Sequence, residues 1–243
     1  MNIIYLHQYF STPSMSSGTR SFEMARRLVK NGHKVYMLSS MHARSSRERK
    51  HFSIEDGIYV WWLPVKYSNN MSYIMRLFSF FRYCYLAIIQ ARKIEYDIVF
   101  GSSTPLTISI PGILLSKLKK TPFILEIRDL WPELPIAIGA LRSQFSIYLA
   151  KLLERWSYDN ADHIIGLSED MCQKIEMNGQ AKNKISNIPN GCDIDLFNIE
   201  AKKGEEFRNK YDWLGLNPLV IYTGALGKMN NVAYLVEIAK HMK

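Results

Sequence analysis

MNIIYLHQYF STPSMSSGTR SFEMARRLVK, residues 1–30, is the stretch that decides the fold of this 243-residue chain. Ile3–Leu6 is an uninterrupted apolar run, which is typical of a strand buried on both faces of a parallel sheet. A helix is predicted from Thr19, because the apolar residues that follow recur at helical spacing until Gly32 ends it. The chain therefore opens with a strand, a loop and a helix.

The loop between them, Gln8–Gly18, contains the first candidate binding residues. Ser17 and Gly18 let backbone N–H groups approach a ligand at the N-terminus of the helix, where the helix dipole favours a phosphate or a carboxylate. Arg20 adds a positive charge in the first helical turn. An ordinary strand-to-helix turn with Thr19 as N-cap explains the same residues, so local sequence leaves both interpretations open.

The alternation of strand and helix continues to residue 188. Strands are expected at 34–40, 58–63, 98–101, 123–127, 162–167 and 185–188, and helices at 71–93, 106–118, 143–160 and 169–177. This order predicts an α/β fold with helices packed on a parallel sheet. In the helix at 143–160 the side chains expected to face inward are Ile147, Leu149, Leu152, Leu153 and Trp156.

A turn signal at Pro189-Asn190-Gly191 marks the end of this pattern. The polar residues that follow are typical of a linker. An apolar strand at Leu219–Thr223, a glycine loop and a helix at Val232–Met242 then repeat the pattern of the first thirty residues. The expected organisation is residues 1–188 as a first domain, 189–217 as a linker and 218–243 as the first βα unit of a second domain.

The net charge of +9 is concentrated in the first part of the chain. Residues 1–150 contain 19 Lys and Arg against nine Asp and Glu, whereas residues 151–243 contain 12 against 13. A basic first part favours a negatively charged partner, which can be anionic lipid, a substrate with a pyrophosphate, or nucleic acid. Nucleic acid fits least well, because no DNA- or RNA-reading motif accompanies the charge.

Cysteine and histidine spacing argues against several kinds of site. Cys84, Cys172 and Cys192 form no CxxC pair, which speaks against a disulfide framework or a zinc site and fits a reducing cytosol. The six histidines show no metal-binding spacing. We therefore expect no metal held by protein ligands. The chain starts directly with a strand and has no basic leader, so no signal peptide is expected.

Met71–Lys93 is the most apolar stretch of the chain. Arg76, Arg82 and Arg92 interrupt it, so no uncharged run approaches the roughly 20 residues of a transmembrane helix, and we do not expect it to span a bilayer. Its broad aromatic face can pack on the sheet, lie in a membrane interface with the arginines at headgroup level, or do both.

A predicted strand ends directly before an unusual ionisable cluster of Arg128, Asp129 and Glu133, with Trp131 between them. Ligands of open parallel sheets bind outside the carboxyl ends of the strands, so this loop and the Gly18 loop are expected to converge on one site. The alternative is a local ion pair between Arg128 and Asp129 beneath a packed Trp131.

Five segments, in chain order, resemble the family 4 glycosyltransferases, which have the GT-B architecture of two facing Rossmann-like domains. They are LHQYF…P…SG.R (residues 6–20), Gly32-His33-Lys34-Val35, Asp97-Ile98-Val99, Asp162 with Ile164, Ile165 and Ser168, and IPNGCDIDLF (residues 188–197). The last segment resembles the family's interdomain hinge. The segment Arg128–Glu133 resembles the corresponding segment of a bacterial subgroup of these enzymes. That subgroup builds O-antigen, capsule and other surface polysaccharides, and it includes the fucosamine transferases.

The resemblance implies a fold: an α/β, doubly wound parallel sheet that forms the Rossmann-like, acceptor-side half of a GT-B enzyme. The start of a donor-binding domain, truncated at Lys243, is expected to follow it. The implied reaction is retaining transfer of a sugar from a nucleotide-sugar donor to a lipid-linked glycan acceptor, without metal or other cofactor. The implied location is the inner face of the cytoplasmic membrane. The chain alone is then expected to be incomplete and inactive.

Residue roles follow from the same resemblance. Gly18 and Arg20 would approach the phosphates, and Arg128 with Asp129 would orient the acceptor and stabilise the transition state. The other residues expected to bind substrate are Tyr9, Ser17, Trp131, Glu133, Asn190 and Gly191 at the hinge, and Gly224, Gly227 and Lys228 at the donor pyrophosphate. The chain departs from the family where Ser17-Gly18 replaces two glycines, and where no histidine lies in sequence near Arg128.

Two other classes of protein remain open. The basic first part and the helix at 71–93 would also suit a non-catalytic module that binds a membrane surface or a sugar nucleotide. A dinucleotide-dependent oxidoreductase fits less well, because the first loop lacks GxGxxG and no acidic residue ends the second strand.

Overall fold

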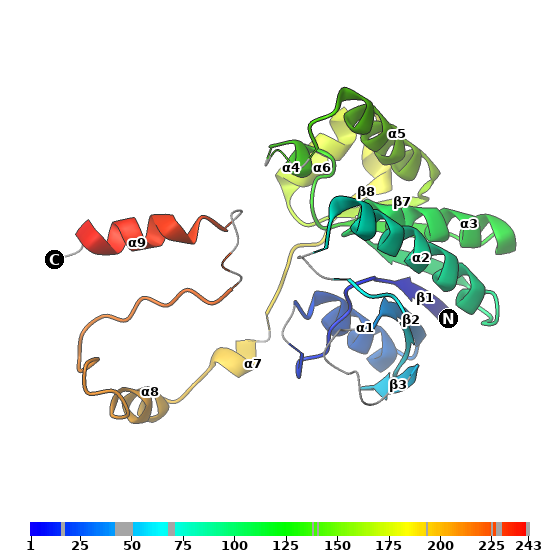
Figure 1. Ribbon diagram of the computed structural model, residues 1–243. Coiled ribbons are helices and arrows are strands. Elements are labelled where there is room, and N and C mark those ends of the chain that lie inside the picture. The colour runs from blue at the N-terminus through cyan, green and yellow to red at the C-terminus, as the bar shows by residue number, and fades with distance from the viewer. Residues whose placement is uncertain are drawn as a thin grey trace. The chain divides into compact units, whose positions relative to one another are not determined.

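The computed structural model of the chain describes residues 1–243 apart from 16–17, 42–50, 68–70, 138, 140, 193, 225, 227–229 and 242–243. The chain divides into two compact units, Met1–Asn190 and Gly191–Lys243 (Figure 1). Unit 1 contains the sheet. The described residues of unit 2 contain the helices α7 (Ile194–Phe197), α8 (Ala201–Arg208) and α9 (Val232–His241).

Unit 1 is built on an eight-stranded sheet with the strand order β3-β4-β2-β1-β5-β6-β7-β8. The strands are β1 (Asn2–Leu6), β2 (Lys34–Ser40), β3 (Phe52–Glu55), β4 (Ile58–Leu63), β5 (Ile98–Ser102), β6 (Phe123–Ile127), β7 (His163–Gly166) and β8 (Ile185–Asn187). Every neighbouring pair is parallel except β3 and β4. The predicted parallel sheet is therefore confirmed.

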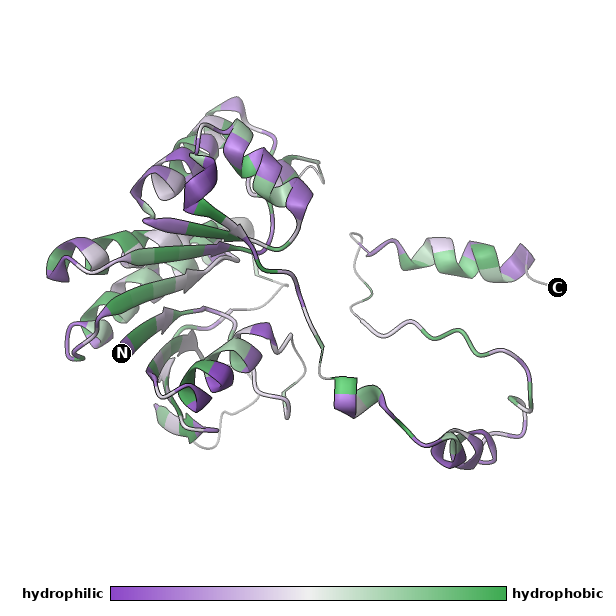
Figure 2. Ribbon diagram, turned by 180° about the vertical axis from the view of Figure 1, so that it is seen from behind, coloured by the Kyte–Doolittle hydropathy of each residue, from purple (hydrophilic) through white to green (hydrophobic). Residues whose placement is uncertain are grey.

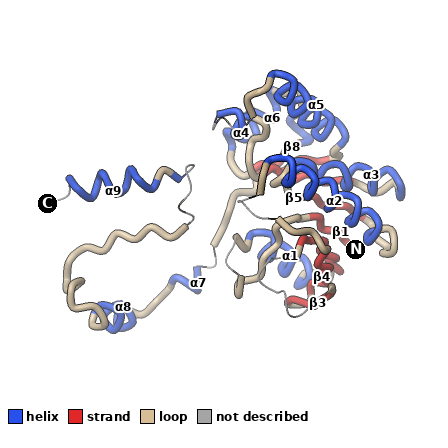
Figure 3. The backbone as a smooth tube through the Cα atoms, viewed as in Figure 1, coloured by secondary structure: helices blue, strands red, loops and turns tan. Residues whose placement is uncertain are grey.

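Helices connect the strands and cover both faces of the sheet (Figures 1 and 3). They are α1 (Arg20–Lys30), α2 (Tyr73–Ala91), η1 (Leu106–Ile108), α3 (Ser109–Lys119), α4 (Glu133–Ala137), α5 (Gln144–Asn160), α6 (Glu169–Met177) and η2 (Lys182–Lys184). Tyr83 of α2, Ile113 of α3 and Tyr158 of α5 belong to one buried cluster. Phe22 of α1 belongs to a second. The sheet is doubly wound, as predicted.

The apolar run of strand β1 is continuous because both faces of the strand are buried. Ile4 and Leu6 belong to the cluster with α2 and α3, whereas Ile3 and Tyr5 belong to the cluster with α1. Each of these side chains is at most 5% exposed. Since complete burial of one large apolar side chain is worth about 1.5–3 kcal/mol, both faces of the strand stabilise the fold. Figure 2 shows the hydrophobic strands enclosed between the helices.

The sheet has one antiparallel edge strand, β3, that the sequence analysis did not predict. It pairs with β4 through a two-residue turn, in which Asp56 and Gly57 have φ angles of 47° and 81°. Positive φ at both central residues is the geometry of a type I′ hairpin, for which Asp-Gly is a preferred sequence. The Asp56-Gly57 pair is therefore a sequence signal for the hairpin that joins β3 to β4.

The buried face of helix α5 matches the prediction in part: Leu153 and Trp156 pack against the core, whereas Leu149 and Leu152 do not. Ala150, Glu154 and Ser157 are at most 6% exposed, whereas Leu149 and Leu152 are 46% and 53% exposed. Small side chains on the buried face let the helix approach its neighbours closely, and the carboxylate of Glu154 accepts a hydrogen bond from Asn178 Nδ2 (3.2 Å). Apolar periodicity alone therefore placed Leu149 and Leu152 wrongly on the buried face.

The strand predicted at Leu219–Thr223 is absent, and these residues have no regular secondary structure. A strand requires hydrogen-bonding partners, and the described residues of unit 2 contain no other strand. The predicted helix is present as α9. Leu214 is the one large apolar side chain that is fully buried among the described residues of unit 2.

Candidate functional site

The carboxyl ends of β1, β5 and β6 carry the polar side chains of the candidate site. These strands are neighbours in the sheet and run parallel, so their ends lie on one edge. His7 follows β1, Ser103 and Thr104 follow β5, and Arg128 and Asp129 follow β6. In open α/β sheets this edge is the one that binds ligands.

The Gly18 loop lies against the end of β6. A Cβ atom built on Gly18 would lie 3.7 Å from Nη2 of Arg128. The two loops are therefore neighbours, as their common place at the carboxyl edge predicts. Thr19 occupies the N-cap position of α1, but its side chain makes no capping hydrogen bond. The first turn of α1 therefore presents backbone N–H groups beside a guanidinium, which suits an anion.

His7 holds Arg128 in place. Its side chain is buried, with Nδ1 2.5 Å from Ser21 Oγ and Nε2 3.3 Å from Nη1 of Arg128. A guanidinium can only donate, so Nε2 accepts and the ring hydrogen is on Nδ1, where it is donated to Ser21. The histidine that the sequence does not place near Arg128 is thus supplied by the end of β1. The signal was its position directly after the first buried strand.

Asp129 is held by a strained residue. Its Oδ2 accepts a hydrogen bond from Thr104 Oγ1 (2.9 Å), and the backbone N–H of Arg128 donates to Ser103 Oγ (2.9 Å). Thr104 has a φ of 106°, which a β-branched residue rarely adopts and which costs of order 1–3 kcal/mol. Arg128 and Asp129 are therefore fixed separately, by different partners, and the side chain of Asp129 is exposed.

The guanidinium of Arg20 donates hydrogen bonds to other residues of unit 1. Its Nε donates to Glu126 Oε1 (2.8 Å), Nη1 to the carbonyl of Pro189 (2.8 Å) and Nη2 to the carbonyl of Ile188 (2.8 Å). Nη1 also lies 3.2 Å from Asn190 Oδ1. All three guanidinium nitrogens thus have protein acceptors, and the predicted contact of Arg20 with a phosphate would require some of these bonds to break.

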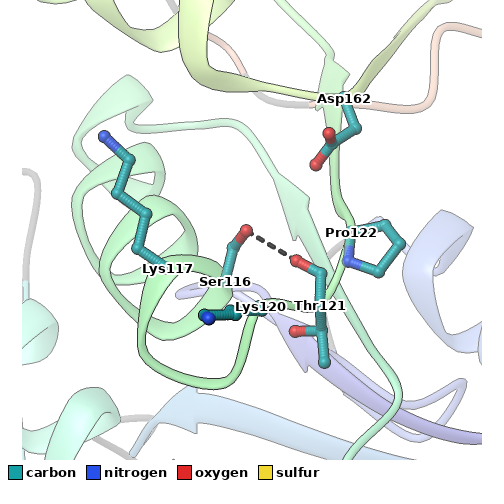
Figure 4. A pocket seen from close by; sticks show the side chains of 6 residues that line it. All are labelled: Ser116, Lys117, Lys120, Thr121, Pro122 and Asp162. Carbon is teal, nitrogen blue, oxygen red and sulfur yellow. Dashed lines mark hydrogen bonds between the residues drawn. The ribbon is translucent and has the colours of Figure 1, made fainter.

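A pocket among the described residues lies at the opposite edge of the sheet (Figure 4). It has a volume of about 440 Å³ and is lined by Ser116, Lys117, Lys120, Thr121, Pro122 and Asp162. Pro122 precedes β6, so the pocket lies at the amino end of that strand and away from Arg128. Asp162 there accepts a hydrogen bond from the N–H of Phe123 (2.8 Å), which is a structural role.

The sequence model described as Glycosyltransferase Family 4 matches residues 17–196, more than half of the chain. The chain belongs to glycosyltransferase family 4. This match includes Gly18, Arg20, Arg128 and Asp129, and it ends just beyond Asn190. No curated protein sequence is significantly similar to this family 4 chain.

Solved structures share the fold of this family 4 chain. Sucrose-phosphate synthase from Thermosynechococcus elongatus has a TM-score of 0.74 at 13% identity, covering 99% of this chain and 60% of that one. Anabaena HepE in complex with UDP and glucose has a TM-score of 0.66 at 16% identity, covering 100% and 58%. UDP-GlcNAc 2-epimerase from Neisseria meningitidis bound to UDP-GlcNAc has a TM-score of 0.52 at 14% identity, covering 99% and 63%.

These likenesses show the fold, a Rossmann-like half of the GT-B kind. The family 4 chain spans about 60% of the length of the synthase. Within the described part of the family 4 chain, no group of three or more His, Cys, Asp or Glu side chains is placed to hold a metal ion.

The remaining predicted site residues of the family 4 chain are spread more widely. The ring of Tyr9 packs on that of Tyr67, with centroids 4.9 Å apart, and Trp131 packs against the core. Glu133 begins α4 and is exposed, and Asn190 and Gly191 are exposed where unit 1 ends. Gly224 belongs to unit 2. Ser17, Gly227 and Lys228 lie outside the described residues.

Proposed function

We propose that this family 4 chain supplies the acceptor-side half of a retaining glycosyltransferase, which moves a sugar from a nucleotide-sugar donor to a lipid-linked glycan acceptor. The observation that carries the proposal is the approach of the Gly18 loop to Arg128 at the carboxyl edge of the sheet. HepE, which shares the fold, was solved in complexes with UDP and with UDP-glucose, which supports a nucleotide sugar here. A role in making a surface polysaccharide such as O-antigen or capsule rests on the segment Arg128–Glu133.

Transfer of the sugar requires positive charge and hydrogen-bond donors that are already in position when the substrate binds. Departure of a nucleoside diphosphate develops negative charge, which a guanidinium and backbone N–H groups stabilise. Arg128, held by His7 beside Gly18, meets this requirement. The exposed carboxylate of Asp129, held by Thr104, suits orientation of an acceptor hydroxyl. With retention, the acceptor oxygen and the leaving diphosphate share one face of the sugar, so both groups belong at one edge of the sheet.

The test combines binding and transfer. The 243-residue chain is titrated with UDP-, GDP- and TDP-sugars by calorimetry, and incubated with each radiolabelled donor and vesicles that contain polyprenyl-diphosphate-linked N-acetylglucosamine. Because we propose that the chain supplies one half of the enzyme, we expect no transfer by the chain alone, and we expect label to enter the lipid extract once a separately produced donor-binding half of a family 4 glycosyltransferase is added. Because we propose that no metal takes part, EDTA should leave the transfer unchanged. A chain that transfers no label even with the added half refutes the proposal, and transfer by the chain alone contradicts its assignment as one half of the enzyme. Donor binding without transfer in either reaction favours a non-catalytic sugar-nucleotide-binding module.

Helix α2 favours attachment to a membrane surface. Its side chains at Ile74, Phe78 and Tyr85 are 65%, 71% and 64% exposed. By length and composition alone the stretch Ile74–Ala91 could cross a membrane, yet in this fold its other face is buried on the sheet through Ala87 and neighbouring residues. We propose that the exposed face binds the anionic inner surface of the cytoplasmic membrane. The lipid-linked acceptor would be presented at that surface.

Vesicle flotation tests this attachment. We expect the chain to float with phosphatidylglycerol-containing vesicles and not with pure phosphatidylcholine, because exposed basic residues such as Arg82 and Arg92 accompany the apolar face. Phe78→Asp should weaken binding at least tenfold. The matched control is Phe145→Asp on α5, where the side chain is 69% exposed, and it should leave binding unchanged. Equal binding by both variants, or no binding to anionic vesicles, contradicts the assignment of α2.

A further inference from the structure

One side chain, Arg20, joins three separate parts of unit 1. It belongs to the first turn of α1, two residues after Gly18. Its Nε and Nη2 each lie 2.8 Å from Glu126 Oε1 in β6, and its Nη1 and Nη2 donate to the carbonyls of Pro189 and Ile188. The loop before α1, the centre of the sheet and the last residues of unit 1 therefore meet at a single guanidinium.

The ion pair at this junction is buried and fully bonded. The side chain of Arg20 is 10% exposed and that of Glu126 is 0% exposed. The second carboxylate oxygen of Glu126 accepts a hydrogen bond from Ser102 Oγ (2.5 Å). A buried carboxylate needs such partners, and removal of one partner alone is strongly destabilising. Glu126 therefore sets the position of the guanidinium, and the guanidinium in turn sets the position of the carbonyls it binds.

The bonds to Ile188, Pro189 and Asn190 have a different role, because they are not needed to neutralise Glu126. These residues form the segment through which the chain leaves the sheet, just before unit 2 starts at Gly191. Ile188 is also tied to the sheet by its own N–H, which donates to the carbonyl of Gly166 (2.9 Å). Beyond that bond, Arg20 supplies three further contacts to the segment.

We propose that Arg20 is a positioning residue that anchors the exit segment Ile188–Asn190 to the Gly18 loop. The planar, five-donor guanidinium suits this task, since it binds a carboxylate and two carbonyls at once, which a lysine ammonium on a single nitrogen cannot do in the same geometry. The consequence for catalysis rests on the proposed function: a ligand that moves the Gly18 loop would move the segment from which the second unit begins.

Substitution of Arg20 by lysine distinguishes the role of its bonds to the exit segment from the role of its ion pair with Glu126. Arg20→Lys keeps a positive charge for Glu126 but gives up most of the bonds to the exit segment. Should that variant fail to fold, Arg20→Met combined with Glu126→Met replaces the buried pair by apolar side chains, which is often tolerated. The matched control is Arg27→Lys on the same helix, because Arg27 binds Glu23 and is exposed.

The measurement is local mobility in the full chain. Backbone order parameters of Asn190 and Gly191 are obtained by ¹⁵N relaxation, and a nitroxide is attached to the exposed Cys192 after Cys172→Ser, while Cys84 is buried. In the wild type and Arg27→Lys we expect order parameters near 0.85 at Asn190, and in Arg20→Lys or the double variant values below about 0.6. The nitroxide spectrum should sharpen in the same variants.

Wild-type order parameters and line shapes in a folded Arg20→Lys variant, or in the folded double variant, would overturn the proposal. None of these readouts needs a nucleotide sugar. Failure of the anchor therefore leaves the glycosyltransferase proposal standing, and failure to bind any donor leaves the anchor standing.

Discussion

His7 and Arg128 are 121 positions apart in sequence, yet one hydrogen bond joins them at the edge of the sheet. Arg128 cannot accept a hydrogen bond, so the contact determines which ring nitrogen of His7 carries hydrogen. A neutral imidazole in this tautomer leaves the positive charge of Arg128 uncompensated by His7. In the proposed function, that charge is available to a substrate phosphate.

The tautomer of His7 can be observed directly. In protein labelled with [¹⁵N]histidine, long-range ¹H–¹⁵N spectra at neutral pH should show a protonated Nδ1 and an unprotonated Nε2, assigned by loss of the signals in His7→Gln. Arg128→Met should let the ring exchange between tautomers. Arg142→Met, which changes an exposed arginine bonded to Gly139, should have no effect. A protonated Nε2 in the wild type would contradict this arrangement.

Asp129 should matter for turnover and little for donor binding. Asp129→Asn keeps an oxygen that can accept the bond from Thr104 but removes the negative charge that we propose orients the acceptor hydroxyl. In the transfer assay we expect kcat to fall about 10²-fold, the lower end of general acid–base effects, with the KM for the donor within twofold. Asp162→Asn, at the opposite edge of the sheet, is the matched control and should keep kcat. An unaltered kcat in Asp129→Asn would refute the role.

At the scale of the secondary-structure elements, helix α5 has a buried face that only partly matches the prediction. Its buried face carries the carboxyl group of Glu154, which is 6% exposed. Burial, reinforced by the nearby charge of Glu133, raises the pKa of Glu154 to about 7. The carboxyl group therefore changes charge near physiological pH.

This raised pKa makes the free energy of unfolding depend on pH. The folded form holds the proton more tightly than the unfolded form, so the contribution of Glu154 is full below the unfolded pKa of 4.5 and is lost as the pH rises toward 7. The loss can reach roughly 3 kcal/mol, at 1.36 kcal/mol per pH unit. Glu154→Gln stays neutral and should be more stable than the wild type at pH 8, with a smaller difference at pH 5.

Urea unfolding of both proteins at pH 5 and pH 8 measures this difference, with the exposed Glu176→Gln as control. A difference between wild type and Glu154→Gln that does not change with pH would show that Glu154 is charged throughout this range.

At the scale of the whole molecule, the two units differ in how they are stabilised. Unit 1 has buried clusters on both faces of its sheet. Among the described residues of unit 2, Trp213, Leu216 and Val220 are 72%, 98% and 79% exposed, and Leu214 alone is a fully buried large apolar side chain. Unit 2 therefore contributes few of the buried contacts that resist unfolding.

Residues 1–190 should consequently fold without unit 2. We expect this shortened chain, which retains every bond of Arg20 described above, to show the helical circular dichroism of unit 1 and a Tm within about 3 °C of the full chain. The Tm shift is small because a change of 1 kcal/mol moves the Tm by only about 2–4 °C at this size. Loss of cooperative melting in the shortened chain would show that unit 2 stabilises the sheet.

Much of this architecture was predictable from local patterns. Central strands such as β1 and β6 were found because burial on both faces demands an apolar run, whereas the edge strand β3 was missed. The strand predicted at Leu219–Thr223 was wrong for the complementary reason: an apolar run becomes a strand only beside another strand. Leu149 and Leu152 of α5 were wrongly placed on its buried face, because close packing favoured Ala150 and Ser157 over the larger leucines.

The candidate site, too, could be predicted from the sequence only in part. That Gly18, Arg128 and Asp129 belong to one edge followed from their positions after parallel strands and needed no coordinates. Which side chains hold them could not be foreseen, since the pairs His7 with Arg128 and Arg20 with Glu126 span 121 and 106 positions. Such pairs form only because the sheet places β1, β5 and β6 side by side. The local apolar pattern determined which residues form strands. The order of the strands in the sheet determined which side chains, far apart in sequence, come into contact at the candidate site.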